Sequence, residues 1–205
     1  ALTGLERQVI GMLHHLVFAR DDAFYAQWLH NAEHSLGAFC SGGTTANLTA
    51  LWASRNNTLR ARDGFAGINQ AGLVAALRHY GYAGLAIVVS ERGHYSLRKA
   101  ADILGIGREN LVPVGVDEDG RMRVDLLRDT LRDLQQRNIR TVAIVGIAGT
   151  TETGAVDPLD AIADVAQEIG CHFHVDAAWG GATLLSARER ARFAGIERAD
   201  SVVID

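Results

Sequence analysis

The residues with the clearest chemical potential lie near the C-terminal end of the chain, in residues 172–181 (His-Phe-His-Val-Asp-Ala-Ala-Trp-Gly-Gly). Their alternating pattern predicts a short β-strand that runs into a glycine-containing loop. Because successive strand side chains face opposite ways, His172, His174 and Asp176 would share one face, with Asp176 at the C-terminal end. Ligands of open parallel sheets bind at that edge. A carboxylate there needs a cation, a metal ion or a hydrogen-bond donor to offset its desolvation.

One interpretation of these three side chains is a metal site. Two imidazoles and a carboxylate at positions i, i+2 and i+4 of one strand face are ligands that suit Zn²⁺. No fourth ligand and no glutamate base stands at a recognisable spacing. We therefore expect no metal ion, and a His/Asp metal-binding domain stays open as an alternative.

A second chemical feature is residues 41–47 (Ser-Gly-Gly-Thr-Thr-Ala-Asn), followed by apolar residues at helical spacing. The pattern predicts a short strand, a glycine turn and a helix of about four turns. Glycines let backbone N–H groups approach an anion, and a helix N-terminus adds partial positive charge. No Gly-Lys-Ser/Thr follows, so this is not the phosphate loop of a nucleoside triphosphatase. The alternative is a tight turn capped by threonines.

Two further loops follow predicted strands. Residues 90–96 (Ser-Glu-Arg-Gly-His-Tyr-Ser) carry His94, and residues 149–154 (Gly-Thr-Thr-Glu-Thr-Gly) follow a strand that ends near Ile147. With Asp176 and the glycine turn, these loops would meet at one edge of the sheet. An anion site, a carboxylate and an imidazole fit pyridoxal phosphate, by its phosphate, its ring nitrogen and its ring face.

The elements that must position these loops alternate along the chain. We predict helices over residues 2–19, 69–80, 96–104 and about 124–134, with a helix and a loop in 21–36, and strands over 85–90, 111–116, 141–147 and 201–205. Asp157 is expected as the N-cap of a further helix, with Pro158 in its first position and Gly170 after its end. The apolar strands suit burial on both faces, so the predicted fold is a three-layer α/β/α domain with a mainly parallel sheet.

Composition limits the classes of partner. The chain has 205 residues, of which 48% are hydrophobic, and its formal net charge is −4. This balance gives no electrostatic reason to expect nucleic acid or an anionic membrane as a partner. The apolar runs are too short to span a bilayer. Cys40 and Cys171 match no metal or disulfide spacing, so we expect both to be reduced, in a cytoplasmic setting.

The four motifs at 41–47, 93–96, 149–151 and 174–181 follow the order and spacing of one family. Through them the chain resembles the pyridoxal-dependent group II amino-acid decarboxylases over nearly its whole length. It looks closest to a bacterial branch of pyridoxal-dependent aspartate 1-decarboxylases, with glutamate decarboxylase next nearest. The resemblance implies pyridoxal 5'-phosphate as cofactor, and decarboxylation of an acidic L-amino acid (aspartate or glutamate), a small molecule, to the amine and CO2.

The resemblance also implies roles for individual residues. Gly43 and Thr44 would bind the phosphate of the cofactor. Two catalytic residues would be His94, which would stack on the ring near the substrate carboxylate, and Asp176, which would pair with the ring nitrogen. Ala178 would pack on the ring face opposite the imidazole.

Thr151 would lie beside the cofactor and support either the Asp176 carboxylate or the ring hydroxyl. The resemblance further implies fold type I, a homodimer, and active sites at the subunit interface. Trp179 is either a wall on the substrate side or a core residue. Arg92 is either a partner for an acidic substrate or an ordinary surface arginine.

One departure from the family concerns the lysine that holds the cofactor covalently. That lysine is expected about three residues after a strand matching residues 199–205, whereas the only lysine here is Lys99, beside Arg98 on a predicted helix. We therefore expect residues 1–205 to be part of the large cofactor-binding domain. The N-terminal segment, the Schiff-base lysine and the small C-terminal domain would be absent, and the chain by itself would be inactive.

Two alternatives concern the reaction. Another fold type I pyridoxal phosphate enzyme, an aminotransferase or a cysteine desulfurase, would give a keto acid or sulfide in place of an amine and CO2. A non-catalytic scaffold would bind the cofactor, or only dimerise, without turnover.

Overall fold

A single parallel sheet forms the centre of the computed structural model, which describes residues 2–205. Its strand order is β2-β1-β3-β4-β5, and every neighbouring pair is parallel. The strands are β1 (Gly84–Ser90), β2 (Leu111–Val114), β3 (Ile139–Ile147), β4 (His172–Asp176) and β5 (Ser201–Val203). The strands predicted over 85–90, 111–116, 141–147, 172–176 and 201–205 are thus present, with β3 beginning two residues earlier and with β2 and β5 each ending two residues earlier than expected.

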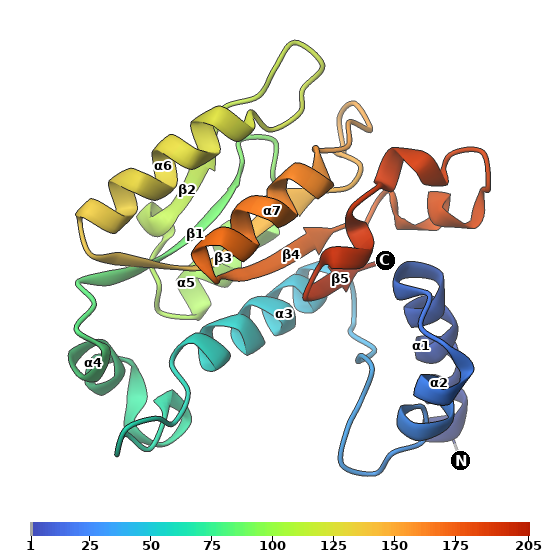
Figure 1. Cartoon of the computed structure of the whole chain (residues 1–205), viewed down its shortest axis with the longest axis horizontal. Helices are drawn as coiled ribbons and strands as arrows, with labels where there is room; N and C mark the ends of the chain where they lie inside the picture. The colour runs from blue at the N-terminus through green and yellow to red at the C-terminus, as the bar shows by residue number, and fades with distance from the viewer. Residues whose placement is uncertain (1) are drawn as a thin grey trace.

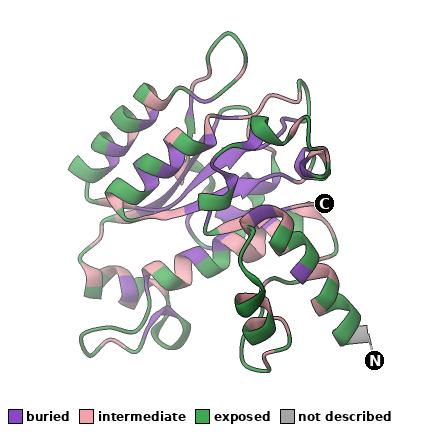
Figure 2. Cartoon of the chain, turned by 45° about the vertical axis from the view of Figure 1, so that its right-hand side comes forward, coloured by how far each residue is buried: buried purple, intermediate pink, exposed green. Residues whose placement is uncertain are grey.

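Helices cover both faces of this sheet (Figure 1). The helices are α1 (Leu2–Phe18), α2 (Asp22–Trp28), α3 (Gly43–Thr58), α4 (Ile68–Tyr80), α5 (Ser96–Ile103), α6 (Val124–Gln136) and α7 (Leu159–Ile169). Short 3-10 turns are η1 (Arg108–Asn110), η2 (Gly181–Leu185), η3 (Arg190–Phe193) and η4 (Ile196–Arg198). Figure 2 shows that the strands are buried between the helices, whose outer faces are exposed.

Two separate hydrophobic cores correspond to the two faces of the sheet. Val88 packs in the core that holds Leu127 of α6 and Ile162 of α7, whereas its neighbour Ile87 packs in the core that holds Leu51 of α3. This division follows from the two-residue period of a strand, which sends adjacent side chains to opposite faces. The three-layer α/β/α fold with a parallel sheet is therefore confirmed.

The order of the strands reverses between β1 and β3. The chain passes from β1 outward to β2, and then returns to the other side of β1 to add β3, β4 and β5. The loops that leave β1 and β3 therefore diverge to opposite sides and open a crevice at the carboxyl edge of the sheet. His94 lies in the loop after β1, and Thr151 lies in the loop after β3.

The first two helices lie beside the β5 edge of the sheet, away from β2 (Figure 1). On α1, Leu5 and Met12 expose 59% and 70% of their surface. Within residues 2–205, the helices are too short or too polar to cross a membrane.

Two local predictions were wrong. Residues 37–40 form no strand, because no neighbouring strand pairs with them on the way from α2 to α3. Asp157 is not the N-cap of α7, which begins at Leu159 with Pro158 in the cap position. The buried Asp157 carboxylate instead accepts hydrogen bonds from the backbone N–H groups of Met122 (2.7 Å) and Ile147 (2.8 Å).

Candidate functional site

A cavity of about 390 Å³ opens at the carboxyl edge of the sheet. Its walls come from the N-terminus of α3 and from the loops that follow β1, β3 and β4, as the strand reversal requires. The structure brings all six predicted site residues to it: Gly43, Thr44, His94, Thr151, Asp176 and Ala178. Residues up to 135 positions apart in the sequence thus share one cavity (178 minus 43).

Asp176 is the last residue of β4 and is 5% exposed. Its Oδ2 accepts a hydrogen bond of 2.9 Å from Nδ2 of Asn47, and its Oδ1 accepts one of 3.2 Å from the backbone N–H of Ala178. Within residues 2–205, no arginine or lysine side chain forms a hydrogen bond or ion pair with this carboxylate. The carboxylate is therefore held by neutral donors on one side while it faces the cavity on the other.

A chain of hydrogen bonds runs behind this carboxylate, away from the cavity. His174 Nε2 lies 2.9 Å from Oδ1 of Asn47, and its Nδ1 lies 2.7 Å from Oγ of Ser201. His172 Nε2 bonds the same hydroxyl at 2.7 Å. Burial, with a smaller effect of the neighbouring imidazole, lowers the pKa of His174 to about 3, so this ring is neutral.

These contacts also bear on the metal-site alternative. A metal ion needs ligand atoms that point to a single centre, whereas His172, His174 and Asp176 are joined in series through Ser201 and Asn47. Within residues 2–205, no group of three or more His, Cys, Asp or Glu side chains has metal-binding geometry. His172, His174 and Asp176 share one face of β4, as predicted, but there they are linked in a chain of hydrogen bonds.

His94 lies in the loop between β1 and α5 and is half-buried. Its Nδ1 is 2.9 Å from Oγ of Ser96 and receives the Ser96 backbone N–H at 3.3 Å. A ring nitrogen that accepts a backbone N–H carries no hydrogen of its own. The N–H of the neutral ring is therefore on Nε2, the nitrogen away from Ser96.

The N-terminus of α3 forms the opposite wall. Gly42 has φ +139°, which an L-residue rarely adopts, and this turn aims the first amide groups of the helix into the cavity. The Gly43 N–H donates to a carboxylate oxygen of Asp205 at 2.9 Å. A carboxylate oxygen of the chain itself thus accepts a hydrogen bond at this helix end, where partial positive charge favours an anion.

Three other side chains complete the cavity. Trp179 is 64% exposed, so of its two interpretations it is a wall and not a core residue. Arg92 is exposed but lines the cavity, and it is the only arginine or lysine among the lining residues. Thr151 also lines it, although the groups that hold Asp176 come from α3 and from Ala178.

One residue at the centre of the site was not predicted. In the sequence, Asn47 is only the last residue of the glycine-turn motif, yet in the structure it is 1% exposed and bonds Asp176, His174 and Ser96. Its position one turn after Gly43 places it on the helix face toward the sheet, which was the available signal. Lys99, by contrast, lies on α5 with its Nζ 4.7 Å from the centre of the Tyr95 ring, and it does not line the cavity.

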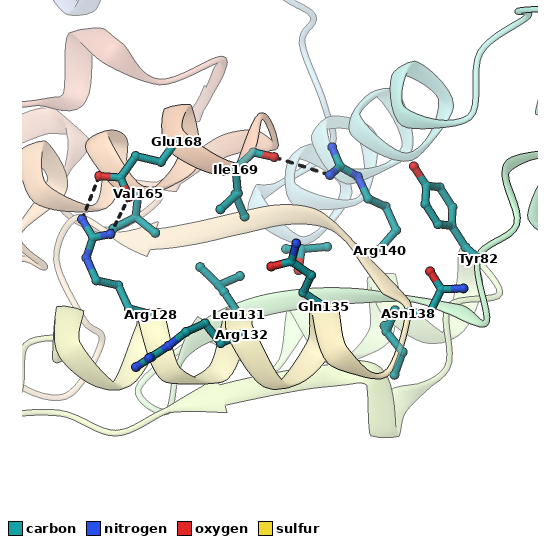
Figure 3. A pocket seen from close by; sticks show the side chains of 12 residues that line it. Tyr82, Arg128, Leu131, Arg132, Gln135, Asn138, Arg140, Val165, Glu168 and Ile169 are labelled. Carbon is teal, nitrogen blue, oxygen red and sulfur yellow. Dashed lines mark hydrogen bonds and ion pairs between the residues drawn. The ribbon is translucent and has the colours of Figure 1, made fainter.

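A larger cavity of about 850 Å³ lies near the start of β3, between α6 and α7 (Figure 3). Its arginines are engaged within the protein: Arg128 with Glu168, Arg132 with Asp129, and Arg140 with the carbonyl groups at the end of α7. None of the predicted site residues lines it. The smaller cavity at the carboxyl edge is therefore the candidate site.

Comparison with known families identifies the family of the chain. The family model described as the pyridoxal-dependent decarboxylase conserved domain matches residues 1–205. The chain belongs to the pyridoxal-dependent decarboxylase family. The resemblance inferred from four sequence motifs is thereby confirmed.

Curated relatives of this decarboxylase family are longer than the chain. An aspartate 1-decarboxylase of Aliivibrio fischeri is 58% identical over 205 residues, which are 100% of this chain and 38% of that protein. A cysteine sulfinic acid decarboxylase of Mus musculus is 40% identical over 166 residues, which are 81% of this chain and 31% of that protein. The chain thus spans about a third of the length of these relatives.

A solved structure of the same family shows the same fold. It is the glutamate decarboxylase domain of diaminobutyrate-pyruvate transaminase and L-2,4-diaminobutyrate decarboxylase from Vibrio parahaemolyticus, with a TM-score of 0.82 and 32% identity. The match covers 99% of this chain and 40% of that chain. The predicted fold type I architecture is therefore confirmed for the part that the chain represents.

The cavity fits the pyridoxal cofactor of this family. Helix amides that already bind a carboxylate oxygen suit a phosphate, and a buried carboxylate on the far side suits a protonated ring nitrogen. The lack of a side chain at Gly43 is also required, since a Cβ there would lie 3.2 Å from the Ala178 Cβ.

Proposed function

We propose that the whole protein is a pyridoxal 5'-phosphate-dependent carboxy-lyase. By the whole protein we mean one of about the relatives' length that contains this chain. Its reaction would convert a small, acidic L-amino acid to the amine and CO2. The observation that carries this proposal is the placement of Asp176: a buried carboxylate at the end of β4 that lines the same cavity as the N-terminal residues of α3. Membership of the decarboxylase family supports it.

When bound, pyridoxal phosphate withdraws electrons from the α-carbon of an amino acid. Asp176 holds a proton on the ring nitrogen, which keeps the ring cationic and electron-withdrawing. Gly43 and Thr44 hold the phosphate through the helix N-terminus. His94 and Ala178 would contact the two faces of the ring, and Thr151, which also lines the cavity, would lie beside it.

An acidic substrate is proposed on two grounds. Arg92 is the only arginine or lysine that lines the cavity within the described residues, and it would attract a side-chain carboxylate. The relatives include enzymes named for aspartate and for cysteine sulfinic acid, both of which carry an anionic side chain. We propose aspartate or glutamate as the substrate on this basis.

The assembly and setting of the protein also belong to the proposal. Leu5 and Met12 form an exposed apolar face on α1, which supports a homodimer. Cys40 and Cys171 are both free thiols, which supports a cytoplasmic location. The chain itself is proposed to be part of the large cofactor-binding domain.

The test is release of CO2 from aspartate and from glutamate by the whole protein with added cofactor. Asp176→Ala should lower the rate about 100-fold or more, since losing about 3 kcal/mol of stabilisation has that effect. Asp102→Ala, on the outer face of α5, is the control and should keep the activity. A keto acid or sulfide product would instead favour an aminotransferase or a cysteine desulfurase.

The 205-residue chain should not release CO2 by itself, because its only lysine, Lys99, lies against Tyr95 outside the cavity. Steady turnover by the isolated chain would contradict this part of the proposal. CO2 release by the whole protein would be consistent with the proposal that the isolated chain is inactive.

A further inference from the structure

Asn47 joins three elements of the fold through one buried side chain. It lies on α3, and its amide contacts Ser96 at the start of α5 and both His174 and Asp176 on β4. Its Nδ2 donates to Oδ2 of Asp176 at 2.9 Å and to Oγ of Ser96 at 3.1 Å, while its Oδ1 lies 2.9 Å from Nε2 of His174. Both amide hydrogens and the amide oxygen are therefore used.

The Asp176 carboxylate determines which way this amide faces, because an ionised carboxylate only accepts hydrogen bonds. Turning the amide over would place its oxygen against that carboxylate, which is a repulsive contact. With the amide oxygen toward His174, Nε2 of this buried, neutral ring carries the single N–H and donates to Asn47, and Nδ1 accepts from the Ser201 hydroxyl.

The same amide sets the direction of the hydrogen bonds that lead to His94. Ser96 accepts a hydrogen from Asn47, so its own hydroxyl hydrogen is directed to Nδ1 of His94 at 2.9 Å. The Ser96 backbone N–H approaches the same nitrogen. Nδ1 of His94 is thus an acceptor, and the ring N–H is on Nε2.

We propose that Asn47 is a positioning residue of the cofactor site. Its single amide fixes the Asp176 carboxylate, and it directs the Ser96 hydroxyl hydrogen to Nδ1 of His94, where this hydroxyl joins the Ser96 backbone N–H in holding the His94 tautomer. The two predicted catalytic residues reach the cavity from different elements, Asp176 from the end of β4 and His94 from the loop after β1, and Asn47 is the side chain that couples them. This inference rests on the proposed function for its effect on catalysis. A neutral carboxamide is needed there because it offers donors to Asp176 and Ser96 and an acceptor to His174 without adding charge.

The decisive variant is Asn47→Asp, which keeps the shape of the side chain but turns an oxygen toward Asp176. Two facing carboxylates share one proton, so Asp176 becomes a weaker partner for the ring nitrogen. In the whole protein with cofactor we expect kcat to fall at least 30-fold with a KM change below threefold. The absorbance of the bound cofactor should also show an additional ionisation with pH.

Ser54→Ala is the matched control. Ser54 lies on the same helix, is fully buried, and donates to the carbonyl oxygen of Val142 at 2.6 Å, outside the cavity. This variant loses one buried hydrogen bond of α3, but it should keep the wild-type kcat and pH titration. A wild-type kcat and titration in Asn47→Asp would overturn the inference.

A second measurement needs neither variant nor activity. In the cofactor-free, whole wild-type protein, nitrogen-15 NMR of the histidine rings should find the hydrogen of neutral His94 on Nε2, whereas a hydrogen on Nδ1 would overturn the inference. This result stands even if Asn47→Asp does not fold. Failure of the wild-type protein to release CO2 would count against the proposed function and leave the tautomer measurement unaffected.

Discussion

Gly43 and Ala178 are neighbours in the wall of the candidate cofactor cavity, so that a Cβ on Gly43 would come within 3.2 Å of the Ala178 Cβ. The same Cβ would lie 3.2 Å from Oδ2 of Asp205. Gly43→Ala should therefore push the α3 N-terminus away from the ring position and weaken cofactor binding about tenfold. Titration of the cofactor-free protein with pyridoxal phosphate measures this change.

Gly4→Ala is the matched control, because Gly4 also lies in the first turn of a helix and a Cβ there would meet nothing within 4 Å. It should bind the cofactor with wild-type affinity. Equal affinity in Gly43→Ala would show that the contact with Ala178 does not limit the cavity.

Trp179 should report cofactor binding by its fluorescence. Its indole is exposed, lines the cavity and packs over the loop after β3, with ring carbons within 3.5 Å of a Cβ placed on Gly149 or Gly154. A pyridoxal ring in the cavity should quench this emission. The quenching should be largely lost in Trp179→Phe but kept in Trp52→Phe, since Trp52 is also exposed, on α3, but lies outside the cavity.

Acid should destabilise the protein through His174. Its pKa falls from 6.5 to about 3 on folding, so between these values the unfolded chain binds a proton that the folded chain does not. The free energy of unfolding should thus decrease as the pH falls, by about 1.4 kcal/mol per pH unit from this group. The stabilising contribution of His174 to the free energy of unfolding is fully present above pH 6.5.

Urea unfolding at pH 6.5 and pH 5 measures this difference. The loss should be about 2 kcal/mol larger in wild type than in His174→Gln, which has no titrating ring. Burial raises the pKa of Asp157 to about 6, and this group stabilises the folded state as the pH falls from 6 to 3.8. Because Asp157 is present in both proteins, its opposite effect cancels in the comparison. Equal losses of unfolding free energy in wild type and His174→Gln would contradict the predicted effect of His174.

Asp157→Asn should destabilise the fold at pH 7. The two carboxylate oxygens accept the N–H groups of Met122 and Ile147, and an asparagine would leave one of these donors facing an NH2 group. An unsatisfied buried donor costs about 1–3 kcal/mol. The midpoint of urea unfolding should fall accordingly, whereas Asp129→Asn, an exposed partner of Arg132, should change stability by no more than about 0.5 kcal/mol. If Asp157→Asn left the free energy of unfolding unchanged, Asp157 would not be stabilising the fold through these two hydrogen bonds.

Much of the fold was predictable because its signals are local. Apolar runs such as 141–147 are typical of strands buried on both faces, and the leucines of α6 recur at helical spacing. Gly170 ends α7 in the left-handed conformation, as expected. The predictions that failed concerned residues 37–40 and Asp157, whose structures depend on partners distant in the sequence.

The sequence by itself determined the element types, the parallel sheet, the family and the six residues around the cavity, because each depends on residue type and short spacing. Only the tertiary structure decided how these residues are held. The roles of Asn47, Ser96 and Asp157 come from hydrogen bonds between segments 35 to 129 residues apart. No local pattern encodes the direction of such a bond, since it is set when the packed helices and strands exclude water and leave each buried polar group a single available partner.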